Sequence, residues 1–252
     1  MKFRVTHPDA SRATETGFEA DDSIGVFIAE AGKLLQPGGN YVNDAKLTYT
    51  ASHWKTAEPI YWNNGTYDVY AYAPYARQIT STTDYPFSVA LDQTGKGYNA
   101  SDFLFASAKA QTASATAVPL QFKHRMSRVC IQLLKGPDYD GDLPDEATVY
   151  VHSTVPQATI DLSVGIPTKY PYGQEATITA RNEGGHRFGA VVVPQRIDRR
   201  RPLFEVVMKG VSYLVEDNFV FRMGMCHTVS LVISKAPEQV KIEIGGEIEN
   251  WN

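Results

Sequence analysis

The sequence is poor in the residues that build covalent or metal-held frameworks. It has 252 residues and only two cysteines, Cys130 and Cys226. Two thiols cannot make a multi-disulfide framework or a four-cysteine zinc site. They could pair with each other in an exported protein, or each could simply pack within a strand. The sequence leaves both interpretations open.

Long apolar runs and a strong net charge are also absent. No apolar run approaches the roughly 20 residues that a membrane-spanning helix needs. The formal net charge of −4 is too small to indicate a nucleic acid or an anionic membrane as a partner. No signal peptide stands at the start, and because Met1 directly precedes a strand-like segment, we expect the export signal to lie upstream of it.

Motifs for catalysis and for cofactors are missing too. The sequence has no nucleophile elbow, no phosphate-binding loop and no Rossmann glycine pattern. The six histidines show no paired metal-ligand spacing, and the acidic loop 137–146 lacks the residue order of a calcium loop. We therefore predict that the protein is not an enzyme and has no catalytic residue, cofactor or metal site.

Alternation of apolar and polar residues, by contrast, runs through the whole chain. It marks sixteen short segments separated by turns rich in Gly, Asn and Pro, and no amphipathic helix longer than two turns can be drawn. This pattern predicts an all-β protein, and the number of strands suits two tandem β-sandwich domains better than one.

The boundary between these domains is predicted from a change in composition. The stretch 106–119 is rich in Ala, Ser and Thr and has almost no large apolar side chain, so we expect a linker or long crossover there. The domains would then span residues 1–115 and 116–252. In the following segment, 120–134, the apolar positions change register near Ser127, which predicts a bulge or a sharp bend.

Six stretches, in this order and spacing, resemble the fimbrillin family, the Mfa-like and major fimbrial subunits of Gram-negative gut and oral anaerobes. They are RATETGFEADDSIGVF (12–27), LTYTASHW with PIYWNNGTYDVYAYAPY (47–75), DFLFASA (102–108), FKHRMSRVCIQL (122–133), VVVPQ (191–195) and GEIENW (246–251).

The resemblance implies an architecture and a biology. It implies two β-sandwich domains with transthyretin-like topology, in a subunit exported as a lipoprotein to the outer membrane and cell surface. It also implies that an Arg-specific protease removes the N-terminal strand and that a strand of a neighbouring subunit replaces it. The product would be a homo- or hetero-polymer, a fimbrium used for cell adhesion. The lipid-bearing cysteine of such a precursor is not in this sequence, and we expect it before Met1.

At the N-terminus, this resemblance gives individual residues a role. The removable strand would carry Phe3 and Val5, followed by a polar tether, 8–21. Within that tether, Arg12 and Ala13 would flank the cleaved bond, because a protease needs an extended and mobile substrate segment.

At the other end of the chain, Val240, Ile242 and Ile244 alternate with charged residues, so that one face of the segment is apolar. This segment is the candidate donor strand. The pattern alone cannot separate a strand lent to a neighbour from the last strand of the second sandwich.

The aromatic residues suggest an alternative function. Eight of them crowd the first half of the chain, and exposed Tyr or Trp stacks well on sugars and on proteins. The second hypothesis is therefore a surface glycan-binding lipoprotein. The structural alternative is that these rings fill the core of the first domain. The eight are Trp54, Tyr61, Trp62, Tyr67, Tyr70, Tyr72, Tyr75 and Tyr85.

Overall fold

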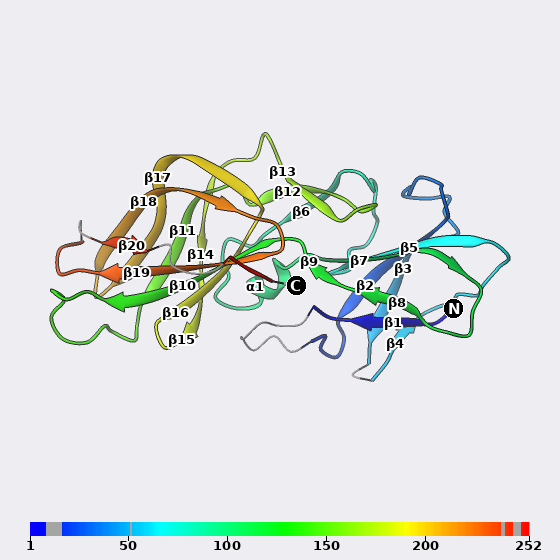
Figure 1. The fold of residues 1–252 in the computed structure, drawn as a ribbon, viewed down its shortest axis with the longest axis horizontal. Coiled ribbons are helices and arrows are strands. Elements are labelled where there is room, and N and C mark those ends of the chain that lie inside the picture. The colour runs from blue at the N-terminus through cyan, green and yellow to red at the C-terminus, as the bar shows by residue number, and fades with distance from the viewer. Residues whose placement is uncertain (9–16, 51, 238–239, 244–247, 252) are drawn as a thin grey trace.

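A computed structural model describes residues 1–8, 17–50, 52–237, 240–243 and 248–251 of the chain. Within these residues every regular element except one short helix, α1 (Lys96–Ala100), is a strand, so the predicted all-β fold is confirmed. Figure 1 shows the strands of the first half at one end of the long axis and most strands of the second half at the other. No helix in the described part of the chain has the length and apolar character needed to cross a membrane.

The N-terminal end is built on a six-stranded antiparallel sheet. Its central strands, β2 and β5, are buried on both faces because successive side chains point to opposite sides. In β2, for example, Ile24 and Val26 face one core and Phe27 faces another. The order of the sheet is β4 (Trp54–Thr56), β3 (Val42–Tyr49), β2 (Ser23–Glu30), β5 (Thr66–Ala73), β7 (Leu104–Thr112) and β9 (Lys123–His124).

Two smaller sheets cover the faces of this sheet. A pair of parallel strands, β1 (Phe3–Thr6) and β8 (Val118–Gln121), covers the core that includes Ile24 and Val26. On the other face a three-stranded sheet packs in the order β13 (Ile166–Lys169), β12 (Gln157–Asp161), β6 (Tyr85–Ser88).

The C-terminal end has two facing sheets around one core. Val129 and Ile131 of β10 meet Val149 and Val206 of the opposite sheet in this core. One sheet has the order β15 (Arg181–Gly184), β16 (Arg187–Val192), β10 (Ser127–Lys135), β19 (Met225–Ile233) and β20 (Lys241–Glu243), and β21 (Ile248–Asn250) also pairs with β19. The other has the order β14 (Ala176–Thr179), β11 (Thr148–Thr154), β17 (Gln195–Met208) and β18 (Val211–Phe221).

Several contacts join the two ends. Strand β6 of the first half pairs with β12 of the second. The buried Gln93 side chain accepts a hydrogen bond from Val191 N–H and donates one to Val191 O, each 2.8 Å long. Arg181 lies over the ring of Tyr98, which α1 carries, at 3.6 Å from the ring centroid. The main core cluster contains residues of both halves. The division into domains 1–115 and 116–252 therefore stays a prediction.

The stretch predicted to be a linker is mostly strand, so that prediction is wrong. Strand β7 covers 104–112 and β8 begins at Val118, leaving only a short crossover between them. Ala106 and Ala108 are 2% and 8% exposed, because they pack into the first core together with Val118 and Leu120 of β8. The predicted break near Ser127 does occur: between β9 and β10 the chain passes from the first-half sheet to the second.

Candidate functional site

Strand β1 is attached to the molecule along one edge. It runs parallel to β8, with Phe3 opposite Val118 and Val5 opposite Leu120. Val118 N–H donates to Lys2 O at 2.8 Å and Phe122 N–H donates to Thr6 O at 2.9 Å. Within the described residues β8 is its sole strand partner, so the outer edge of β1 presents unpaired backbone groups (Figure 1).

The side chains of β1 alternate between the core and solvent. Phe3 and Val5 are half-buried against the first core, while Arg4 and Thr6 are exposed. Beside them in the same two-stranded sheet lie Val118 and Leu120 of β8, which are 2% and 0% exposed. Loss of β1 would therefore open one side of two buried side chains and, among the described residues, leave β8 without a strand partner.

A groove runs along the free edge of β1. It has a volume of about 730 Å³ and is bounded on the far side by apolar or aromatic side chains of β3, β4 and the loop after them. These are Leu47, Tyr49, Trp54 and Ile60. The second layer over this core is thus incomplete even with β1 in place, and a larger segment than β1 would have apolar surface to cover.

Both described ends of the tether are held to the body of the protein. On the far side of the tether, Phe18 packs edge-on against Trp54 and Phe122, with ring centroids 4.9 and 5.6 Å apart, and it also contacts the His7 ring. Asp21 N–H then donates to Tyr49 O at 2.9 Å, which starts the path into β2. The candidate cleavage residues, Arg12 and Ala13, lie outside the described residues.

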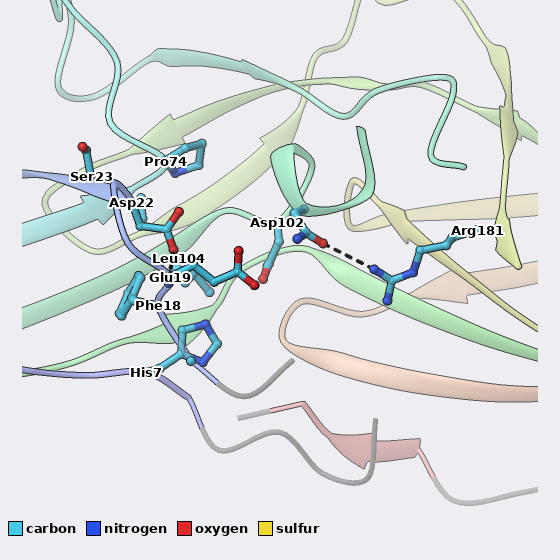
Figure 2. Close-up of a pocket in the computed structure, with 12 residues that line it drawn as sticks. His7, Phe18, Glu19, Asp22, Ser23, Pro74, Asp102, Leu104 and Arg181 are labelled. Atoms are coloured by element: carbon cyan, nitrogen blue, oxygen red, sulfur yellow. Dashed lines mark hydrogen bonds between the residues drawn. The ribbon is translucent and has the colours of Figure 1, made fainter. Parts of the chain in front are cut away.

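A polar cavity of about 260 Å³ lies between these two ends of the tether (Figure 2). His7 and Phe18 line it from the tether side, and Arg181 reaches in from the C-terminal half, donating a 3.4 Å hydrogen bond to Asn99 Oδ1. Three carboxylates also line it: Glu19, Asp22 and Asp102. The cavity places charged groups of both halves beside the proposed tether.

The candidate donor segment forms an edge of the second sandwich. Strand β20 pairs antiparallel with β19, with Ile242 opposite Leu231. Val240 and Ile242 are half-buried against the main core, and Ile244 lies outside the described residues. A groove of about 890 Å³ separates this segment from Leu214 and its neighbours on β18, so little of the segment is enclosed.

The chain end reaches the same region as the tether. Trp251 is 2% exposed and stacks on His124, with ring centroids 3.9 Å apart and planes 2° from parallel. His124 also hydrogen-bonds through Nδ1 to Asp102 Oδ1 at 2.9 Å, and its ring lies 6.0 Å from that of His7. His124 is thus a buried histidine whose ring is both stacked and hydrogen-bonded. Sequence reasoning missed the role of Trp251, which no local pattern signals.

The aromatic residues of the first half are mostly core residues. Tyr67, Tyr70, Tyr72 and Tyr85 are 9% exposed or less, while Tyr61 is 71% exposed. The Tyr72 hydroxyl donates to Asp44 Oδ1 at 2.8 Å; burial is the main cause that raises the Tyr72 pKa, and Asp44 raises it further. The interpretation of these rings as core packing is confirmed for those four.

The described residues form an all-β protein whose first strand, β1, and C-terminal strand β20 lie at sheet edges, where backbone groups are open to a further strand. More specifically, the chain belongs to the fimbrillin-like family, whose model matches residues 11–251. Family membership supports a fimbrial or adhesin role at the cell surface and, with it, a structural rather than an enzymatic protein.

Solved structures with a similar fold come from Bacteroides. A candidate cell adhesion protein of Bacteroides ovatus has 18% identity and a TM-score of 0.77, covering 100% of this chain and 97% of that one. A candidate cell adhesion protein of Bacteroides uniformis has 20% identity and a TM-score of 0.72, covering 93% of each chain. A fimbrial protein of Bacteroides ovatus has 17% identity and a TM-score of 0.60 over 91% of this chain, but only 48% of that one. No curated protein matches the chain.

Proposed function

We propose that this protein is a fimbrial subunit that polymerises by strand exchange. An Arg-specific protease cuts between Arg12 and Ala13, β1 leaves, and the C-terminal segment of a neighbouring subunit takes its position beside β8. The single observation that carries this proposal is the attachment of β1: one edge, four residues and two half-buried apolar side chains.

The energetic comparison favours exchange. Fully burying an aliphatic or aromatic side chain is worth roughly 1.5–3 kcal/mol, so Phe3 and Val5 contribute less than about 6 kcal/mol. A donor that presents Val240, Ile242 and Ile244 would bury three side chains and reach roughly 5–9 kcal/mol, before the entropic cost of association and the loss of the contacts that β20 makes in its own subunit. The open groove beside β1 gives such a donor further apolar surface to cover.

Backbone chemistry supports the same exchange. When β1 is gone, the N–H groups of Val118 and Phe122 lose the Lys2 and Thr6 carbonyls that they donate to. Leaving buried backbone groups without hydrogen bonds costs free energy. The vacated edge of β8 therefore favours the binding of another extended segment. Such a junction needs no covalent bond.

The proposal places the precursor in the outer membrane as a lipoprotein and the mature subunit in a surface fimbrium. Its partners are other fimbrial subunits, in a homo- or hetero-polymer, and a host or bacterial surface molecule bound for adhesion. Because four of the eight first-half aromatics are buried and three more are half-buried, no described observation favours a glycan-binding lipoprotein over this assignment.

The test is limited digestion of the purified chain with an Arg-specific protease. Mass spectrometry should find a released 1–12 peptide, and size-exclusion chromatography should find oligomers that form as it is released. Arg12→Gln should block both events. Arg4→Gln is the matched control, because Arg4 is held in the β1 ladder and its loss should leave cleavage at Arg12 intact. Cleaved protein that stays monomeric at high concentration would contradict the proposal.

A further inference from the structure

Two sulfur atoms meet on the outer face of the C-terminal sheet. Cys130 is on β10 and Cys226 is on β19, and these neighbouring strands run parallel. Arg128 lies opposite Cys226, and Cys130 follows two residues after Arg128 on β10. Side chains two residues apart on a strand share a face. Their Sγ atoms are 2.8 Å apart, although 96 positions separate them in the sequence.

This geometry fits a disulfide better than it fits two packed thiols. An S–S bond is about 2.05 Å long, so the two sulfur atoms need to approach by less than about 1 Å to bond. The strands are already fixed side by side by a continuous ladder from residue 128 to 135 of β10. Bond formation therefore starts from two sulfur atoms that neighbouring strands already hold close together, and it requires their side chains to rotate toward each other.

A positive charge lies close to the two sulfur atoms. Arg128 lies on the same face as both sulfur atoms and pairs with Glu183 at 2.9 Å. Burial lowers the Arg128 pKa. The nearby groups raise it by more, so the guanidinium stays charged; these groups are Tyr98, Cys130, Glu183 and Cys226. A neighbouring cation stabilises a thiolate. Cys130 is half-buried, so an oxidant can reach one sulfur from solvent, while Cys226 is 9% exposed.

We infer that Cys130 and Cys226 form a disulfide that staples β10 to β19 once the protein is exported. The Cys130 thiolate attacks one sulfur of an oxidised thiol–disulfide oxidoreductase or of a small-molecule disulfide. The resulting mixed disulfide is attacked by the Cys226 thiolate, which forms the S–S bond of the protein. Two protons leave the cysteines, and the oxidant's disulfide takes up two electrons to become two thiols. An exported, surface-exposed protein passes through compartments where such bonds persist.

The position of the bond gives it a mechanical consequence, which rests on the proposed function. Strand β19 is the strand on which the C-terminal segment pairs: Cys226 itself stands opposite Glu249 of β21, and Leu231 opposite Ile242 of β20. When this segment is donated to a neighbour, a pull on it reaches β19 first through the chain itself, because β19 is the strand that precedes it. The staple ties β19 to the central strand β10, so that the load is shared by the sheet.

The first experiment counts thiols in the full chain, without protease. The protein is equilibrated with oxidised glutathione, denatured and alkylated. We expect no alkylated cysteine, an intact mass lower by about 2 Da than that of the reduced protein, and one peptide pair that links Cys130 to Cys226. Two alkylated thiols, or glutathione attached to either cysteine, would overturn the inference. This readout does not depend on cleavage or polymerisation, so its failure is distinct from failure of the proposed function.

The second experiment measures what the bond does. The oxidised chain should unfold roughly 10 °C above the reduced chain, because the bond closes a long loop in the unfolded state. The double variant Cys130→Ala/Cys226→Ala should show no response to reductant; if it fails to fold, the reduced natural chain serves as the comparison. In single-molecule pulling, the oxidised chain should release about 300 Å less contour length than the reduced chain, the length of the locked loop. Equal lengths in both states would contradict the staple.

Discussion

Trp251 lies flat against His124, with the ring planes 2° from parallel and the centroids 3.9 Å apart. This stack joins the last described residue of the chain to the segment that links the two halves. Trp251 N–H also donates to Gly224 O at 2.9 Å, and the preceding strand, β21, pairs with the start of β19. The end of the C-terminal segment is therefore held by the stack of Trp251 on His124 as well as by the pairing of its short strand with β19.

The first prediction concerns this fastening. Trp251→Ala should free the tip, because truncating a buried Trp costs about 3–5 kcal/mol where the site cannot collapse. Hydrogen exchange at the β19 amides that pair with β21 should quicken by about tenfold or more. Trp251→Phe, which keeps an aromatic ring for stacking, is the matched control. Unchanged exchange in Trp251→Ala would mean that the stack does not hold the segment.

The second prediction tests how β1 is held. Val5→Asp puts a charge on the half-buried side of β1 and should loosen it from β8, because a carboxylate facing an apolar core loses solvation. The amides of Val118 and Phe122, which donate to β1 carbonyls, should then exchange about tenfold faster. Thr6→Asp, on the exposed side of the same strand, should leave them as they are. Equal exchange in the two variants would contradict the one-sided attachment of β1.

The third prediction concerns pH. Burial, and secondarily the charge of Arg222, lowers the pKa of His227 in the folded protein below its usual value near 6.5. The unfolded chain therefore binds more protons than the folded chain below about pH 6.5, so stability falls as the pH falls through the window between the unfolded and folded pKa values. His227→Gln keeps an acceptor for the Arg222 N–H and should flatten this part of the pH profile. Chemical denaturation at pH 7.5 and 5.5 measures it, with His53→Gln, at an exposed site, as the control.

The fourth prediction concerns the close approach of β2 to an aromatic ring. A Cβ added at Gly25 would lie 2.1 Å from Tyr72 Cε1 and 2.7 Å from Asp44 Oδ1. Gly25→Ala should therefore displace the Tyr72 ring and its hydrogen bond, at a cost of about 1–3 kcal/mol or more in the free energy of unfolding. Gly38→Ala, which meets nothing within 4 Å, should be neutral or slightly stabilising. Urea unfolding of the two variants provides the comparison.

The local residue pattern predicted the fold class and part of the chain's path between the sheets. Alternation with a period of two was enough to predict an all-β chain, since it follows from the pleat of each strand and needs no knowledge of the partner strand. The change of apolar register near Ser127 likewise predicted the place where the chain leaves one sheet for the other. Composition misled at 106–119, because Ala106 and Ala108 lie on a strand whose small side chains pack into the first core, and composition alone does not show that contact.

The sequence by itself thus determined that the protein is built of strands and which side chains of each strand are apolar. Only the tertiary structure decided that β1 pairs with β8, that Trp251 reaches His124, and that Cys130 meets Cys226. The physical reason is that backbone hydrogen bonds are the same for every strand pair. The choice of partner is therefore made by the packing of whole sheets, between residues that are far apart in the chain.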